Sequence, residues 1–268
     1  KIETSFRDFF SEIKELKSVE IREIVESLAR DVFAPPPIRK TGGSTAATLA
    51  AEKILEATNR ERVSTGIKPI IAEKRLNDAA SKKISDMIAK NYFAHVSPDG
   101  KGAGEWVGVA GYRYILIGEN LAMGNFKDEE DLVTAWMASP GHRANILNPK
   151  FKEIGIAVKK GIIEGTSALI AVQIFGLSVS SCPEPDETIK MTIEALDREL
   201  KSQKIHIDGL REKMENAKKE NDREAYSSLV GEYNIAVERY NKAVESAKSL
   251  VEFYNTGVRA FNACALKQ

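Results

Sequence analysis

The last third of the sequence carries the pattern that most restricts its fold. From residue 186 to 219, and again from 223 to 264, apolar residues recur at alternating steps of four and three. That alternation forms the seam of a coiled coil, and the polar stretch 219–223 between the two runs predicts an antiparallel helical hairpin. The seam of the first run is Ile189, Ile193, Leu196, Leu200, Gln203, Ile207, Leu210, Met214 and Ala217, and that of the second is Tyr226, Val230, Tyr233, Val237, Tyr240, Val244, Ala247, Val251, Tyr254, Val258 and Phe261.

The two cysteines of the chain, Cys182 and Cys264, flank this hairpin. At about 1.5 Å per helical residue the first arm is roughly 50 Å long and the second roughly 62 Å. Four extended residues before the first arm add about 13 Å. Both cysteines therefore reach the open end of the hairpin. A disulfide there would fasten the hairpin to the base of the main domain and would indicate an oxidising compartment, whereas the alternative is two free thiols.

Composition excludes some classes of partner. Lys plus Arg equals Asp plus Glu at 39 each, so no net charge draws the chain to nucleic acid or to an anionic membrane. No run of apolar residues approaches the length of a transmembrane helix. Because the sequence begins at Lys1 rather than Met, we expect that an export signal was removed or that the chain was trimmed, and any membrane anchor would have preceded this start.

The remaining sequence divides at its proline-rich stretches, which predict linkers. Residues 1–34 form an amphipathic helical arm, 35–45 a linker, 46–181 a main domain and 182–268 the hairpin. Within the main domain, apolar spacing predicts helices near residues 44–65, 73–90, 104–110 and 128–137, and β-rich runs predict strands at 154–158 and 168–175. The fold class is therefore α+β, with helices on both sides of a sheet.

Three titratable side chains in the main domain could form a polar cleft. His95, Glu119 and His142 each lie beside a turn-forming sequence, and the chain has only three histidines. Imidazoles are common metal ligands, and a carboxylate can orient an imidazole or share its cation. The alternatives are a structural His95 that bonds the turn at 97–100, a Glu119 that accepts backbone N–H groups, and a His142 exposed by chance. The third histidine, His206, is predicted to be solvated on the hairpin.

Residues 46–176 contain a series of short motifs: Asn59-Arg60, Gly66-Ile67-Lys68-Pro69, His95-Val96-Ser97-Pro98-Asp99-Gly100, Gly111-Tyr112, Gly118-Glu119-Asn120-Leu121-Ala122, Trp136-Met137-Ala138-Ser139-Pro140-Gly141-His142-Arg143-Ala144-Asn145-Ile146-Leu147, Glu153-Ile154-Gly155-Ile156 and Gln173-Ile174-Phe175-Gly176. In this order the motifs resemble the CAP superfamily (cysteine-rich secretory proteins, antigen 5 and pathogenesis-related proteins) in its bacterial form. The resemblance implies an α-β-α sandwich with a cleft lined by two histidines and two acids. The histidines fall on His95 and His142 and one acid on Glu119, but the position of the second acid holds Ser139.

Ser139 beside His142 invites comparison with a serine nucleophile, but the sequence favours a simpler role. Serine followed by proline suits the N-cap and first position of a helix, and no Gly-x-Ser-x-Gly context surrounds it. Asn120 and Gln173 are expected on the wall of the cleft. If a metal binds, His95 and His142 with water, and perhaps Glu119, suit Zn²⁺ best.

We therefore expect a secreted, cell-surface or periplasmic binding module whose cleft takes a small polar or lipid ligand, an envelope component, or a divalent metal. A metal-dependent hydrolase, acting on peptides or cell wall, is the alternative, with Glu119 as general base. Against it stand the absent second acid and the absence of a His-Glu-x-x-His motif. A third hypothesis is a structural or assembly protein that acts through the hairpin, which could also dock a protein partner. Whether the chain is an enzyme stays open at this point.

Overall fold

The structure is a computed structural model that describes residues 32–41 and 48–266. The described residues form two compact units, one ending at Ser181 and the other spanning Cys182–Leu266. The N-terminal arm predicted for residues 1–34 falls outside the described residues except at its last three positions. No helix within the described residues is long and apolar enough to cross a membrane.

A mixed sheet forms the centre of the first unit. Its order is β1-β4-β6-β5-β3 within the described residues, and β2 also pairs with β4. Strand β6 pairs antiparallel with both β4 and β5. The short strands β1 and β2 pair in parallel with β4, and β3 pairs in parallel with β5. The strands are β1 (Val32–Phe33), β2 (Ile38–Lys40), β3 (Ile71–Ala72), β4 (Tyr114–Gly124), β5 (Glu153–Ile163) and β6 (Thr166–Ser178).

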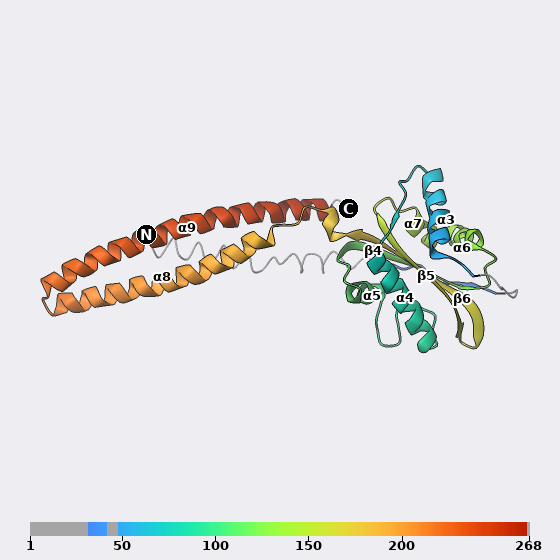
Figure 1. Ribbon diagram of the computed structural model, residues 1–268, viewed down its shortest axis with the longest axis horizontal. Helices are drawn as coiled ribbons and strands as arrows, with labels where there is room; N and C mark the ends of the chain where they lie inside the picture. The colour runs from blue at the N-terminus through green and yellow to red at the C-terminus, as the bar shows by residue number, and fades with distance from the viewer. Residues whose placement is uncertain (1–31, 42–47, 267–268) are drawn as a thin grey trace. The chain divides into compact units, whose positions relative to one another are not determined.

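Helices cover both faces of this sheet, as the α-β-α sandwich predicts (Figure 1). Side chains alternate along β6, so Ile170, Val172 and Ile174 face one core while Leu169 and Phe175 face the other. The first core contains α4 and α5, and the second contains α3, α6 and α7. The helices are α3 (Ala51–Ser64), α4 (Lys74–Ala89), α5 (Ala103–Val109), α6 (Glu129–Ala138) and α7 (Pro140–Ile146).

The linker predicted at residues 35–45 is wrong for its first part, because Ile38–Lys40 forms strand β2. Strands β1 and β2 are two pieces of one edge strand, and both pair with β4. Between Phe33 and Ile38 this strand advances five residues while its partner β4 advances four, so residues 34–37 bulge away from the ladder. Proline is tolerated at such an edge bulge because its missing N–H leaves no ladder bond broken. We call Val32–Lys40 the edge segment.

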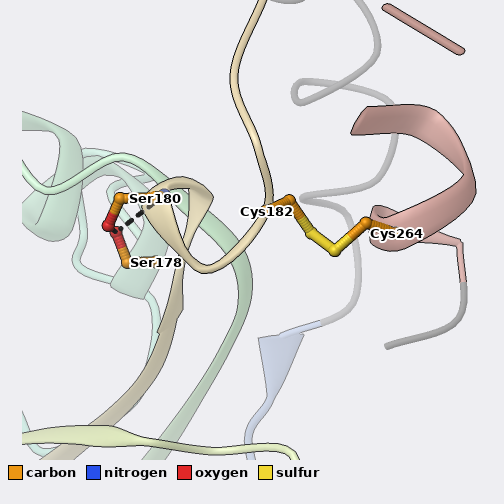
Figure 2. The surroundings of a disulfide bond; sticks show 4 residues. All are labelled: Ser178, Ser180, Cys182 and Cys264. Carbon is orange, nitrogen blue, oxygen red and sulfur yellow. Dashed lines mark hydrogen bonds between the residues drawn. A yellow bond between two sulfur atoms is a disulfide. The ribbon is translucent and has the colours of Figure 1, made fainter. Parts of the chain in front are cut away.

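The second unit is the predicted helical hairpin. After the short helix η1 (Val179–Ser181), which closes the first unit, α8 (Glu187–Lys219) and α9 (Arg223–Ala265) pack along the predicted seam. Asp186 and Asp222 cap the two helices, since each carboxylate accepts a backbone N–H from the first turn. A disulfide joins Cys182 to Cys264 at the open end, which confirms the predicted pairing (Figure 2).

Candidate functional site

The candidate residues gather at the outer edge of β4. Glu119 and Asn120 are consecutive on this strand and so point to opposite faces of the sheet. His95 follows α4, which covers one face, and His142 lies on α7, which packs on the other. The site therefore wraps around the edge of the sheet, where the edge segment pairs with β4.

His95 is held at both ring nitrogens. Its Nδ1 lies 2.6 Å from Oε1 of Glu119, and its Nε2 lies 2.6 Å from the backbone carbonyl oxygen of Pro35. A carbonyl oxygen only accepts hydrogen bonds, so Nε2 must carry a proton. The proton between Nδ1 and Glu119 then belongs either to an imidazolium facing a carboxylate or to a carboxylic acid facing a neutral imidazole. In both cases His95 donates to the carbonyl of Pro35.

Lys83 fixes the backbone of His95, and the sequence analysis missed it. This fully buried lysine donates from Nζ to the carbonyl of His95 at 2.7 Å and to the hydroxyl of Tyr92 at 3.3 Å. Burial lowers the pKa of Lys83, while the negative charges of Glu119 and Asp86 oppose that shift. A signal was present in the sequence, because Lys83 falls seven residues after Leu76 and four before Met87, on the apolar face of its helix.

Glu119 is fully buried, and the structure separates its two oxygens. Oε1 contacts His95, whereas Oε2 has no hydrogen-bond partner among the described residues. The alternative in which Glu119 accepts backbone N–H groups is not what these contacts show. Burying a carboxylate oxygen without a hydrogen-bond partner costs free energy, and Oε2 of Glu119 retains the capacity to accept a hydrogen bond.

His142 is fully buried, which contradicts the alternative of chance exposure. Its Nδ1 lies 2.8 Å from the hydroxyl of Ser139, and its Nε2 makes no hydrogen bond of normal geometry within the described residues, although the backbone of Leu121 is near. Burial, and to a smaller degree the nearby charge of His95, lowers the pKa of His142 to about 4. The imidazole is therefore neutral at pH 7.

The structure corrects the predicted cap at Ser139. Ser139 occupies the N-cap position of α7 with Pro140 next to it, but its side chain makes no capping hydrogen bond. The hydroxyl instead bonds His142. The helix begins with the fixed backbone angle of proline, so the hydroxyl remains available to orient an imidazole.

Asn120 belongs to a buried amide network on the other face of β4. Its Nδ2 donates to the carbonyl of His142 and to Oε1 of Gln173, and its Oδ1 accepts from Asn145. Gln173 in turn donates to the hydroxyl of Thr58 at 2.9 Å. Both amide hydrogens of Asn120 are thus used within the protein, so it positions α7 rather than lining the site.

The predicted Zn²⁺ ligands do not fit a metal centre as they are arranged. Both nitrogens of His95 are engaged, which leaves only Nε2 of His142. Across residues 32–41 and 48–266, no three His, Cys, Asp or Glu side chains converge closely enough to hold a metal ion. Zn²⁺ binding at His95 and His142 stays a prediction, and it would require Pro35 to leave His95.

Comparison with known proteins identifies the first unit. Residues 55–175 match the model of the cysteine-rich secretory protein family, CAP. The uncharacterized protein YkwD of Bacillus subtilis (strain 168) is 41% identical over 135 residues, which are 48% of this chain and 52% of that protein. The uncharacterized membrane protein YlbC of the same organism is 29% identical over 113 residues, 42% of this chain and 32% of that protein.

The chain thus spans about half the length of YkwD and a third of YlbC. Among solved structures, an extracellular protein containing a SCP domain from Bacillus anthracis str. Ames aligns with a TM-score of 0.41 and 25% identity, over 51% of this chain and 45% of that one. The edge segment and the hairpin lie outside the residues that match the family model. Residues 55–175 are thus a CAP domain, as the match to the family model shows.

Proposed function

We propose that the CAP domain is a binding module that recognises its ligand through a carbonyl oxygen. One observation carries the proposal: the N–H at Nε2 of His95 already holds a main-chain carbonyl, that of Pro35, with Glu119 fixed behind the ring. A hydrogen bond supported by a charged or proton-sharing partner is among the stronger kinds. Oε2 of Glu119, on the same carboxylate that holds His95, has no hydrogen-bond partner within the described residues.

Binding is favoured over hydrolysis by the state of the two histidines. A general base must have a free nitrogen directed at the proton it removes, and its other nitrogen is normally held by an acceptor. His95 has no free nitrogen here. The Nε2 of His142 is free but fully buried, and no carboxylate within the described residues bonds it. The contact between Ser139 and His142 therefore lacks the third group of a catalytic triad.

We place the protein outside the cytosol, secreted or at the cell surface, because a disulfide closes the hairpin. Disulfides persist in oxidising compartments and are rare where glutathione keeps thiols reduced. The hairpin itself is a candidate for docking a protein partner, while the CAP domain of the same chain would carry the ligand site.

The proposal is tested by nuclear magnetic resonance of the histidine rings in the full chain. The probe is N-acetyl-L-prolinamide, which presents the same kind of acyl-proline carbonyl as Pro35 and is added in large excess because Pro35 competes for the same N–H. We expect a saturable shift of the His95 ring signals. The exposed His206 of α8 is an internal control whose signals should stay in place.

Absence of a shift at His95, or an equal shift at His206, would contradict carbonyl recognition. A His95→Gln variant should lose the response while it keeps the folded spectrum. Hydrolysis of the probe, detected as the release of acetate or ammonia, would favour an enzyme over a binding module.

A further inference from the structure

We propose that the edge segment is a displaceable internal occupant of the site, and that the external ligand is an extended, proline-containing peptide that pairs with β4 in its place. This inference rests on the proposed function, because it names the class of ligand whose carbonyl His95 receives. Three features of the molecule support it: the groups that the site binds, the room beside them, and the contacts that attach the edge segment.

The site binds main-chain carbonyl groups of the edge segment. His95 binds the carbonyl of Pro35, and Nδ2 of Asn145 donates to the carbonyl of Phe33 at 2.9 Å. The pairing of β1 and β2 with β4 is also made by main-chain groups. Main-chain carbonyls are common to all peptides, so these contacts recognise an extended chain, in the manner of a strand added to the edge of a sheet.

The shape of the surface favours proline at the centre of that chain. A Cβ atom placed on Gly141 would lie 2.5 Å from Cβ of Pro35, so the missing side chain at the start of α7 makes room for the proline ring. A Cβ on Gly124 would lie 2.3 Å from the carbonyl oxygen of Lys40, where the backbones come closest. The absent side chain at Gly141 therefore leaves room for a proline ring, and the backbones approach closely at Gly124.

Some side-chain attachments of the edge segment are exposed, whereas Lys40 is half-buried in its ion pair with Asp131 at 2.6 Å. Arg39 pairs with Glu164 at 2.8 Å, with side chains 43% and 48% exposed, and the ring of Phe33 packs edge-on against Phe151 while Phe33 remains 45% exposed. Surface ion pairs contribute little, about 0–1 kcal/mol. Three prolines supply no N–H to β4. The opposite edge of β4 pairs with β6 along ten residues, so the sheet can persist when the edge segment leaves.

Release of the edge segment would expose three features together: the free edge of β4, the N–H of His95 and the space beside Gly141 that Pro35 now fills. A free strand edge pairs readily with another extended chain. A proline-rich peptide is already extended in solution and loses little conformational entropy on binding. The occupant inside the chain has an effective concentration in the millimolar range, so an external peptide binds well only when the edge segment is weakened.

The test measures fluorescence anisotropy of a labelled peptide, VFAPPPIRKT, which reproduces residues 32–41, with the full chain. A Phe33→Ala, Arg39→Ala double variant weakens the edge segment without altering β4 or His95. We expect this variant to bind the peptide at least tenfold more tightly than the wild type. A further Gly141→Ala change should abolish that gain, whereas Gly108→Ala, at a helical glycine with open space around it, should leave it intact.

Equal affinity for wild type and double variant, or no binding to either, would overturn the inference. If the double variant does not fold, hydrogen exchange on the wild type decides the matter. A displaceable segment requires the amides of Phe33, Ile38 and Arg39 to exchange at least a hundredfold faster than those of β6, and equal protection would refute it. A response of His95 to N-acetyl-L-prolinamide without peptide binding would leave the proposed function standing and remove only this inference.

Discussion

Replacing Cys182 and Cys264 by serine should destabilise the hairpin and leave the CAP domain unchanged. The disulfide closes a loop with a sequence separation of 82, and both of its ends lie in the hairpin unit. In the chain-entropy treatment, a loop of this length restricts the unfolded chain by about 4.5 kcal/mol at 25 °C. For a unit of this size we expect the melting temperature to fall by roughly 20 °C or more.

The two units carry separate spectroscopic probes. Both tryptophans, Trp106 and Trp136, are buried in the CAP domain, whereas the helical ellipticity is dominated by α8 and α9. Thermal unfolding followed by ellipticity should shift in the Cys182→Ser, Cys264→Ser variant, while the tryptophan fluorescence transition stays in place. Wild type with reductant is the matched control. A shift of both transitions together, or of neither, would refute the reasoning.

Three further changes follow from buried polar groups. Arg62→Met should lower the free energy of unfolding in urea by about 3 kcal/mol or more, because the guanidinium donates to four backbone carbonyls. Arg60→Met, at an exposed arginine, is the control, and equal losses in the two variants would contradict this reasoning. In the unfolded state His142 takes up a proton near pH 6.5, whereas in the folded state the buried ring does so only near pH 4. The free energy of unfolding should therefore fall by roughly 3 kcal/mol as the pH drops from 6.5 to 4. His142→Gln should flatten that profile, and an unchanged slope would exclude His142 as the cause. Gln203→Leu should raise the hairpin's melting temperature, because Oε1 of Gln203 has no partner within the described seam, and a lower value would show that the amide is satisfied.

Elements with a long, regular pattern could be predicted from the sequence. Apolar residues at alternating steps of four and three predicted the bounds of both hairpin helices to within a few residues. The lengths of these helices predicted that the two cysteines lie close together. Helix α4 and strand β6 also lie close to their predicted positions, whereas β5 continues to Ile163, five residues beyond its predicted end. Helix α3 begins at Ala51, later than predicted, because the backbone of Ala50 at its N-cap is extended.

Strand β4 and the edge segment could not be predicted so readily. The segment 114–124 is buried on both faces, and its polar Glu119 and Asn120 interrupt any simple alternation. The prolines before Ile38 have the composition of a linker, and only the partner strand shows that they form a bulge. The candidate residues His95, Glu119 and His142 do meet at one edge, but the carbonyl that His95 binds comes from Pro35, which lies 60 residues away in the sequence.

The protonation of His95 tests the central claim most directly. Recognition of a carbonyl requires a proton on Nε2, since the oxygen of Pro35 can only accept. Long-range nitrogen–proton correlation spectra of the labelled full chain report which ring nitrogens carry protons. We predict a protonated, slowly exchanging Nε2 in the wild type, with faster exchange in the Phe33→Ala, Arg39→Ala variant. An unprotonated Nε2 in the wild type would contradict the account, because His95 would then offer no donor to a carbonyl.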